Sequence, residues 1–215
     1  MAPRKAPGSG RRSLSSAREE ARHCRACDLW KHATQTVFGE GPPGATIVMI
    51  GEQPGDTEDI SGHPFVGPAG KLLDRALEAA GIARASVYVT NVVKHFKWEP
   101  RGKRRIHKKP RLSEQAACRP WLDTELAVIK PRAVLCLGAT AAQALLGSGF
   151  KVTAHRGERI QSPLAPIVMA TVHPSSILRA RDHDSREKEL EQFIADLRAL
   201  AKALERSHEI AKPRK

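Results

Sequence analysis

Four short apolar segments alternate with segments of helical pattern along this chain. The apolar segments cover residues 46–50, 86–93, 133–137 and 167–172. Runs of this length, rich in β-branched side chains, are typical of strands buried on both faces of a parallel sheet. Because helical segments separate them, the pattern predicts an α/β fold, a three-layer α/β/α sandwich with a mostly parallel central sheet of about four strands.

The segments between these strands predict helices. The expected helices cover residues 71–80, 113–130 and 138–146, and a longer one starts at Asp184. Ser113 is expected to cap the second helix, and Pro120 inside it predicts a kink or a fresh helix start. The last helix has an apolar stripe at helical spacing, made of Leu190, Phe193, Ile194, Leu197, Leu200 and Leu204. Residues 150–162 are expected to form two short strands or a loop.

The length of 215 residues predicts a single domain, which we place at residues 19–206. A basic, disordered arm (1–18) and a basic tail (207–215) are expected to flank it. No apolar run approaches the ~20 residues of a membrane span. The arm lacks the apolar core of a secretory signal. We therefore expect a cytoplasmic monomer without a membrane partner.

Positive charge dominates the composition. The chain has 36 Lys and Arg against 23 Asp and Glu, and its net charge of +13 indicates a polyanionic partner, most simply nucleic acid. Nine of the 18 residues from Lys94 to Arg111 are Lys or Arg, and Phe96 and Trp98 lie among them. This segment is expected to be a long loop that contacts a nucleic-acid backbone. A solvated surface segment is the alternative.

An acidic, glycine-rich loop follows the first predicted strand, at residues 51–70. Its four carboxylates belong to Glu52, Asp56, Glu58 and Asp59. It also contains the large ring of Phe65. Open parallel sheets place their sites in such strand-to-helix loops. A solvated acidic turn is the alternative.

Two other predicted strands also end in polar residues. Asn91 closes the second strand, and His173 follows the fourth. Because the carboxyl ends of parallel strands meet at one edge, Glu52, Asn91 and His173 are expected in one crevice. The Asn91 amide is suited to read a base edge, and an amide satisfied within a turn is the alternative.

His107 lies in the basic segment. Its neighbouring cations are Arg104, Arg105, Lys108 and Lys109. Like charge disfavours a further positive charge on the imidazole, so we expect a neutral, nucleophilic ring. A surface histidine without a role is the alternative.

Four cysteines suggest a metal site. Cys24 and Cys27 form a C-x2-C pair that can grip one metal ion or cluster if other segments complete the ligand set. Cysteines stay reduced in the cytosol, so metal binding ranks above disulfides. Cys136 lies within an apolar strand, where a packed core thiol is expected.

Three motifs in order resemble those of the uracil-DNA glycosylase superfamily: GEQPGDTED…GHPFVGPAG, VTNVVK and HPSS. The resemblance runs from about Cys24 to the last helix and is nearest to the iron–sulfur family 4 branch. Gln53 after Glu52, and the inserted KRRIH at residues 103–107, are similar to UdgX, a subgroup that becomes covalently trapped on uracil-containing DNA.

The resemblance implies a 4Fe-4S cluster. Cys24, Cys27 and Cys118 match the family's ligands, and His95 stands where the family has its remaining cysteine. Ligand chemistry alone leaves Zn2+ held by three cysteines and a histidine as the alternative.

The resemblance also implies uracil-containing DNA as the substrate, with single strands preferred. Phe65 would stack on the uracil, Asn91 would pair with its edge, and His173 would donate to its O2. Gly55 matches the position from which other branches exclude thymine. The remaining expected substrate-binding residues are Arg104, Arg105 and Ser175.

The resemblance predicts a suicide-type glycosylase that works once. After the N-glycosidic bond breaks, His107 would attack C1′ of the sugar, and Glu52 would stabilise the cationic sugar or orient His107. The other residues expected to be catalytic are Gln53, Asp56 and Asp59. Two alternatives stay open: a conventional multiple-turnover uracil-DNA glycosylase using activated water, and a non-catalytic, metal-stabilised nucleic-acid-binding module.

Overall fold

The computed structural model describes residues 13–211, in which strands and helices alternate as predicted. The strands are β1 (Ile47–Gly51), β2 (Val87–Asn91), β3 (Trp98–Arg101), β4 (Arg104–His107), β5 (Ala133–Leu137), β6 (Arg159–Ile160) and β7 (Ile167–Thr171). The α-helices are α1 (Leu14–Arg22), α2 (Asp56–Ser61), α3 (Pro68–Ala79), α4 (Leu112–Ile129), α5 (Ala139–Leu146), α6 (Pro174–Leu178) and α7 (His183–Ala211). Short 3-10 turns form at η1 (Asp28–Lys31) and η2 (Arg84–Ser86).

The central sheet of the described residues has five strands in the order β2-β1-β5-β7-β6. The four strands predicted from apolar runs are parallel to one another. The fifth, β6, pairs antiparallel with the edge of β7 and comes from the segment expected to hold short strands or a loop. The predicted α/β fold with a mostly parallel sheet is confirmed.

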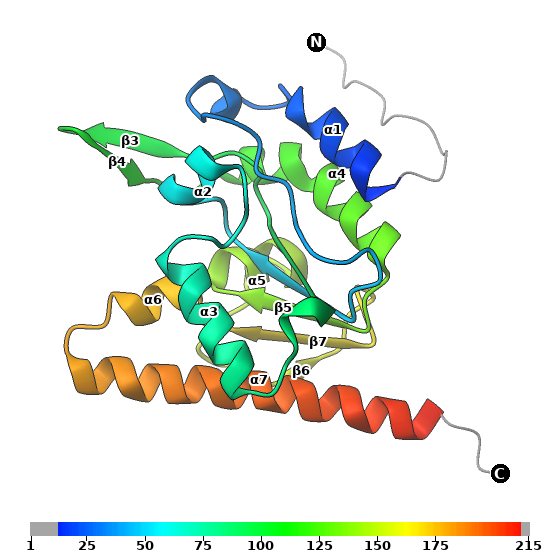
Figure 1. Cartoon of the computed structure of the whole chain (residues 1–215). Coiled ribbons are helices and arrows are strands. Elements are labelled where there is room, and N and C mark those ends of the chain that lie inside the picture. The colour runs from blue at the N-terminus through cyan, green and yellow to red at the C-terminus, as the bar shows by residue number, and fades with distance from the viewer. Residues whose placement is uncertain (1–12, 212–215) are drawn as a thin grey trace.

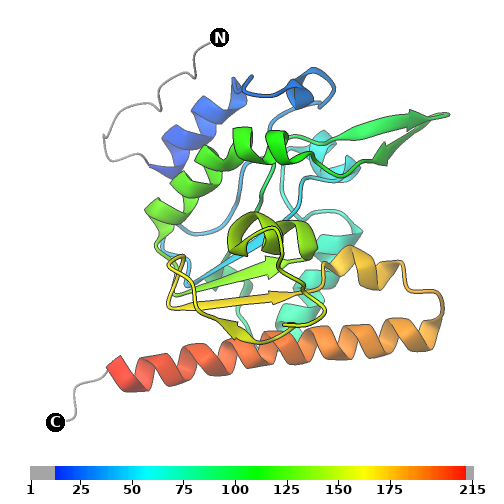
Figure 2. The same ribbon diagram turned by 180° about the vertical axis from the view of Figure 1, so that it is seen from behind.

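Helices cover both faces of this sheet (Figure 1 and Figure 2). Helices α3, α6 and α7 pack on the face that carries Ile47 and Met49, while α4 and α5 pack on the face that carries Val48 and Ile50. Because both faces are covered, every residue of β1 is buried. The sheet therefore presents polar groups to a ligand only at the ends of its strands.

The two ends of the domain differ from the predicted boundaries. Helix α1 begins at Leu14, so residues 14–18 are helical, although the sequence predicts a disordered arm there. The Ser13 hydroxyl caps this helix by accepting the backbone N–H of Ser16. Helix α7 continues to Ala211, beyond the predicted start of the tail at residue 207. Residues 1–12 and 212–215 of the arm and tail lie outside the described part of the chain.

Helix α7 carries the apolar stripe predicted for it. Phe193, Leu197 and Leu200 are fully buried in the core under the sheet. None of the described helices combines the length and apolar character that a membrane span requires. Helix α7 lies below β7 and contacts α3 and α6 on the same side of the sheet (Figure 1 and Figure 2).

Helix α4 starts and continues differently from the prediction. Ser113 does not cap it: Arg111 is the N-cap residue, and the Glu114 carboxylate accepts the Arg111 backbone N–H at 2.6 Å. The helix then runs through Pro120 without a fresh start. A proline removes one helix hydrogen bond, and burial of Leu122 and other apolar side chains of α4 against the sheet offsets this loss.

The basic segment forms a β-hairpin, and its prediction as a long loop is wrong. Strands β3 and β4 pair antiparallel, with Trp98 opposite His107 and Arg101 opposite Arg104. Gly102 at the turn has a φ of +59°, a left-handed conformation that glycine adopts without strain. Four of the eight residues of β3 and β4 are charged, so hydrophobic alternation gives no strand signal. The hairpin projects from the body of the protein (Figure 1).

A buried ion pair connects the segment after β2 to α4. Lys94 Nζ lies 2.6 Å from Glu125 Oε2, and their side chains are 1% and 0% exposed. Glu125 also accepts hydrogen bonds from the hydroxyls of Tyr88 and Thr90 and from the backbone N–H of Gly39. A fully satisfied set of this kind is tolerated in a core, whereas loss of one partner leaves an unpaired buried charge.

Replacing Lys94 with Met should therefore destabilise the protein strongly. We expect the free energy of unfolding to fall by about 3–5 kcal/mol, because Glu125 loses its counter-charge inside the core. Urea denaturation measures this change. The control Arg22→Met removes an exposed cation that pairs with Glu19, and it should change stability by less than about 1 kcal/mol. Equal losses in the two variants would contradict the importance of the buried pair.

Candidate active site

A cavity of about 780 Å³ opens at the carboxyl edge of the sheet. Strands β1, β2 and β7 bring Glu52, Asn91 and His173 to its wall, as expected from the polar strand ends. The predicted site residues that line it are Glu52, Gln53, Gly55, Phe65, Asn91, His107, His173 and Ser175. A site assembled from four separate segments of the chain thus faces one space.

The Glu52 carboxylate lies between two partners. The Thr140 hydroxyl donates a hydrogen bond to its Oε2, and Nε2 of His107 lies 3.2 Å from its Oε1. The contact with His107 is not aligned as a hydrogen bond, so within residues 13–211 Oε1 is a buried acceptor without a donor. Burial raises the pKa of Glu52, but His107, Thr140 and His173 outweigh it, and the pKa lies below its ordinary value. Glu52 is therefore ionised at neutral pH.

His173 is held as a neutral hydrogen-bond donor. Its Nδ1 accepts the backbone N–H of Ser175 at 3.1 Å and lies 2.8 Å from the Ser175 hydroxyl. Burial lowers the pKa of His173 to about 4. The neutral ring therefore carries its proton on Nε2, which has no acceptor among the described residues. This N–H is available to a bound molecule.

Phe65 and Asn91 form the adjacent wall. The ring of Phe65 stacks toward the ring of His173, with 6.0 Å between centroids. Asn91 is 3% exposed, and no described residue is hydrogen-bonded to its amide. A Cβ on Gly51 would lie 2.8 Å from the Phe65 ring and closer still to Oδ1 of Asn91, so only glycine fits at the end of β1.

Gly55 and Glu58 shape the loop beside this wall. Glu58 accepts the backbone N–H groups of Gly55 and Gly67, at 3.1 and 2.8 Å. A Cβ on Gly55 would approach Oε2 of Glu58 to 2.7 Å. Because glycine has no Cβ, the Glu58 carboxylate can lie next to position 55 and join it to Gly67 through these two hydrogen bonds.

Gln53 fastens the hairpin to the loop after β1. Its Oε1 accepts the backbone N–H of Lys97 at 3.0 Å, and its Nε2 donates to the carbonyls of Lys97 and Lys108, both at 3.1 Å. These bonds reach the chain on both sides of the hairpin, next to His107. Both polar atoms of the amide are engaged in these bonds, so Gln53 holds the hairpin at the wall of the cavity.

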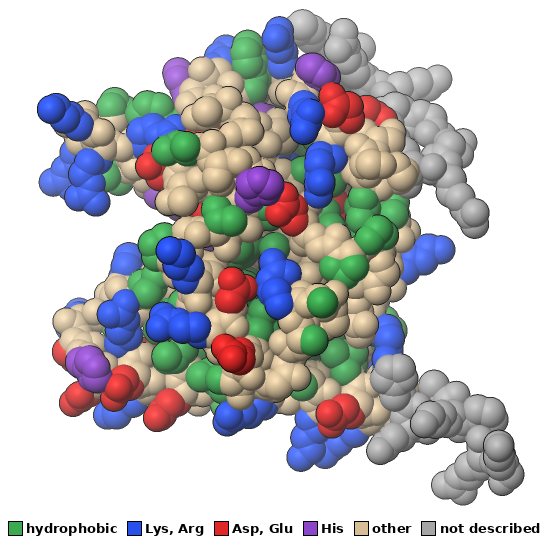
Figure 3. All heavy atoms as spheres, in the orientation of Figure 1, with side chains coloured by type: hydrophobic (Ala, Val, Ile, Leu, Met, Phe, Trp, Pro, Cys, Tyr) green, Lys and Arg blue, Asp and Glu red, His purple; other side chains and the backbone are tan. Residues whose placement is uncertain are grey.

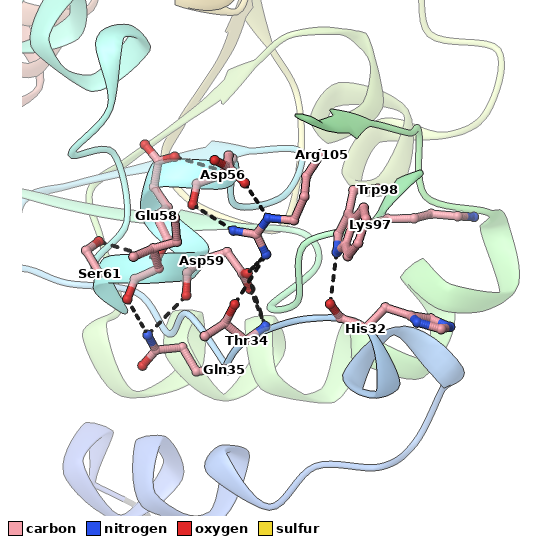
Figure 4. A network of polar contacts seen from close by, with 12 residues as sticks. His32, Thr34, Gln35, Asp56, Glu58, Asp59, Ser61, Lys97, Trp98 and Arg105 are labelled. Carbon is pink, nitrogen blue, oxygen red and sulfur yellow. Dashed lines mark hydrogen bonds and ion pairs between the residues drawn. The ribbon is translucent and has the colours of Figure 1, made fainter. Parts of the chain in front are cut away.

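Arg105 anchors the hairpin to α2 (Figure 4). Its Nε lies 2.5 Å from Asp56 Oδ1, and its Nη1 lies 2.6 Å from Asp59 Oδ2. Asp59 is fully buried and also accepts the backbone N–H of Thr34. None of the three charged residues lines the cavity. The structure therefore places Asp56, Asp59 and Arg105 outside the cavity, where they join the hairpin to α2.

Other cations remain at the rim of the cavity. Lys109 and Arg179 line it, although no sequence motif indicates that they are site residues. Arg104 does not line the cavity and is exposed at the hairpin turn. Figure 3 shows Lys and Arg side chains gathered on the hairpin, beside a notch between the hairpin and the body below it. This distribution suits contact with a phosphate backbone.

Three cysteines lie close to one another beside α4. The Trp121 ring N–H donates to Sγ of Cys24, and the Lys94 backbone N–H donates to Sγ of Cys118, both at 3.2 Å. Burial raises the pKa of Cys118 to about 12, and the nearby thiols of Cys24 and Cys27 also raise it. Such a thiol becomes an anionic ligand only when a metal takes the place of its proton. The fourth cysteine, in β5, is buried among apolar side chains as predicted.

His95 is suited to ligation in its neutral form. It is 5% exposed, and its Nε2 lies 2.9 Å from the Thr36 hydroxyl. Burial lowers the pKa of His95, and a neutral imidazole is the form that binds metals. In the described part of the chain, no three His, Cys, Asp or Glu side chains converge as a single ion requires. Cys24, Cys27, Cys118 and His95 supply the sulfur and nitrogen donors that either a cluster or Zn2+ accepts.

Comparison with known proteins identifies the family. The model of the uracil-DNA glycosylase superfamily matches residues 38–198, a segment that contains all the residues lining the cavity. The chain belongs to the uracil-DNA glycosylase superfamily. The superfamily match begins after Cys24 and Cys27, so it leaves the C-x2-C pair outside.

Several curated members of the superfamily cover most of this chain. A type-4 uracil-DNA glycosylase of Thermotoga maritima is 40% identical over 176 residues, which are 81% of this chain and 88% of the relative. One from Sulfurisphaera tokodaii is 36% identical over 197 residues, 88% of this chain and 85% of the relative. One from Archaeoglobus fulgidus is 37% identical over 175 residues, 77% and 83% of the two chains.

His173 should stay neutral at a pH where most histidines are protonated. Its pKa of about 4 lies below the ordinary value of about 6.5, so at about pH 5.5 we expect a neutral ring with the proton on Nε2. Two-dimensional 1H–15N NMR of the ring nitrogens distinguishes the forms. Because the unfolded chain takes up this proton more readily, His173 should also lower stability as pH falls from about 6.5 toward 4. A ring protonated at about pH 5.5 would contradict this assignment.

Proposed function

We propose that this protein excises uracil from DNA and is then captured on the abasic sugar by His107, as a self-inactivating glycosylase of the UdgX type. One observation carries the proposal: Nε2 of His107 lies 3.2 Å from Glu52 in the cavity that Asn91 and His173 line. A histidine that only contacted phosphate would have no need to meet the ionised carboxylate of the site. The family membership supports the excision of uracil.

Recognition of uracil follows from the cavity wall. The target nucleotide must leave the base stack to reach a space at the end of the sheet. Phe65 offers an aromatic face for stacking, and the unpaired amide of Asn91 offers a donor and an acceptor for the base edge. Uracil presents an acceptor where cytosine presents a donor, so a fixed amide discriminates between them.

Departure of uracil needs stabilisation of negative charge. As the N-glycosidic bond breaks, its electron pair moves to the base, and charge develops on O2. The Nε2–H of His173 donates a hydrogen bond to this oxygen while the ring stays neutral, since Ser175 fixes the tautomer. The ionised carboxylate of Glu52 stabilises the cationic sugar that remains after uracil departs.

Capture follows on the same sugar. A nitrogen lone pair of the His107 ring forms a bond to C1′, which takes the place of the bond to uracil. The alkylated ring then loses the proton of its other nitrogen, and the uracil anion gains one from solvent, so charge balances. Without a group placed to protonate and expel the imidazole, the adduct persists and each protein molecule reacts once.

A 4Fe-4S cluster would be held by Cys24, Cys27, Cys118 and His95. When bound, it supplies a covalent cross-link between the segment before η1, the segment after β2 and helix α4, and it has no part in the bond changes at the sugar. The N–H donors to two of the sulfurs are consistent with thiolate ligands. Phosphates of single-stranded DNA would be held by Lys109, Arg179 and Arg104. The protein would act as a monomer in the cytoplasm.

The adduct is tested directly on a denaturing gel. Incubation with uracil-containing single-stranded DNA should give a slow, heat-stable band in the native protein. His107→Ala should abolish the band, because the attacking nitrogen is removed, and should retain uracil release, because Asn91 and His173 are intact. The matched variant Lys108→Ala, at the next position, should still form the band.

The alternatives give different results in the same assay. A conventional glycosylase releases more uracil than there is enzyme and forms no band. A non-catalytic binding module releases no uracil and binds uracil-containing and thymine-containing strands equally. Absence of the band in the native protein would contradict the proposed capture by His107.

The cluster has its own signature. Protein purified without oxygen should be coloured, with an absorption band at about 400 nm and about four irons per chain. His95→Ala should weaken or abolish the band. Cys136→Ala should leave it intact, because Cys136 lies in β5 and burial alone raises its pKa, whereas Cys24 and Cys27 also act on Cys118. A colourless protein with stoichiometric zinc would reject the cluster.

A further inference from the structure

Thr140 is the one residue of α5 that makes a hydrogen bond to a group of the catalytic centre. It is the second residue of this helix, and its side chain is 4% exposed. Its hydroxyl donates to Oε2 of Glu52. Sequence patterns gave no sign of this contact, because Thr140 lies in a helix of small residues that reads as core packing.

The geometry points to Thr140 as a positioning residue that fixes the Glu52 carboxylate so that its other oxygen faces His107. This inference rests on the proposed capture of the sugar by His107. With Oε2 held by Thr140, rotation of the carboxylate is restricted, and Oε1 remains beside Nε2 of His107. The three side chains thus form a row from α5, through the end of β1, to the hairpin.

The state of the other Glu52 oxygen, Oε1, explains why a hydrogen bond from Thr140 is needed. Oε1 is buried and has no aligned donor within the described residues, so no other hydrogen bond orients it. A carboxylate free to rotate would turn this oxygen toward any donor in the cavity. The Thr140 hydroxyl removes that freedom at the other oxygen, where it does not compete with the substrate.

The hydroxyl also favours the ionised form of Glu52. It adds to the contact with His107 in lowering the pKa of this carboxyl, against the effect of burial. The start of α5 contributes in the same sense, because the amino end of a helix favours a nearby negative charge. A carboxylate that is ionised and oriented is what both sugar stabilisation and His107 orientation require.

Thr140→Val removes the hydroxyl and keeps the shape of the side chain. The rate of adduct formation, followed on denaturing gels from about pH 4 to 8, should fall about tenfold or more, as expected for loss of a hydrogen bond to a charged group. The acidic limb of the pH–rate profile should move to higher pH, because Glu52 without this hydrogen bond holds its proton more tightly. Thr140→Ser should restore both the rate and the acidic limb.

Two controls separate this role from a structural one. Thr124→Val removes a hydroxyl that bonds only the Pro120 carbonyl on α4, and it should leave the rate and the pH profile unchanged. Thermal unfolding reports whether each variant folds, and Thr140→Ala removes the same hydroxyl if the valine variant does not fold. A uniform loss at every pH, or a serine variant as impaired as the valine variant, overturns the inference.

Assays of the native protein separate a failure of the capture by His107 from a failure of the role of Thr140. If it releases uracil but forms no adduct, the capture by His107 fails, and the role of Thr140 in it falls too. If it forms the adduct and Thr140→Val reacts with the native rate and pH profile, only the inference about Thr140 fails.

Discussion

A buried carboxylate, that of Asp59, holds the hairpin in place. It pairs with Arg105 and accepts the Thr34 backbone N–H, so its charge is compensated although it is fully buried. Arg105 and His107 are two residues apart on β4, and alternate residues of a strand face the same side. Anchoring Arg105 therefore turns His107 toward the body of the protein, where it meets Glu52.

Carboxylates of the acidic loop pair with a cation of the basic hairpin. Asp56 and Asp59 pair with Arg105, and Glu58 bonds to backbone N–H groups of its own loop. Of the loop's four carboxylates, only Glu52 lies beside a histidine in the cavity. A loop whose composition opposes DNA binding thus presents little free negative charge to a DNA strand, and the remaining cations of the hairpin dominate the rim.

The cysteine segment and the hairpin are also connected. The Trp98 ring N–H donates to the His32 carbonyl at 2.8 Å, and Arg105 reaches the Thr34 hydroxyl at 3.2 Å (Figure 4). Both partners lie shortly after Cys27 in the chain. The segment after Cys27 therefore braces the hairpin that carries His107.

The sequence alone determined the parallel strands, the core helices and the edge of the sheet at which Glu52, Asn91 and His173 meet. These features follow from burial of apolar side chains, which leaves a pattern along the chain itself. Only the tertiary structure decided that the basic segment is a hairpin, that Gln53, Asp56, Asp59 and Arg105 hold it, and that Thr140 holds Glu52. Those outcomes depend on which polar groups pair across long stretches of chain, and a hydrogen-bond partner distant in sequence leaves no periodic signal.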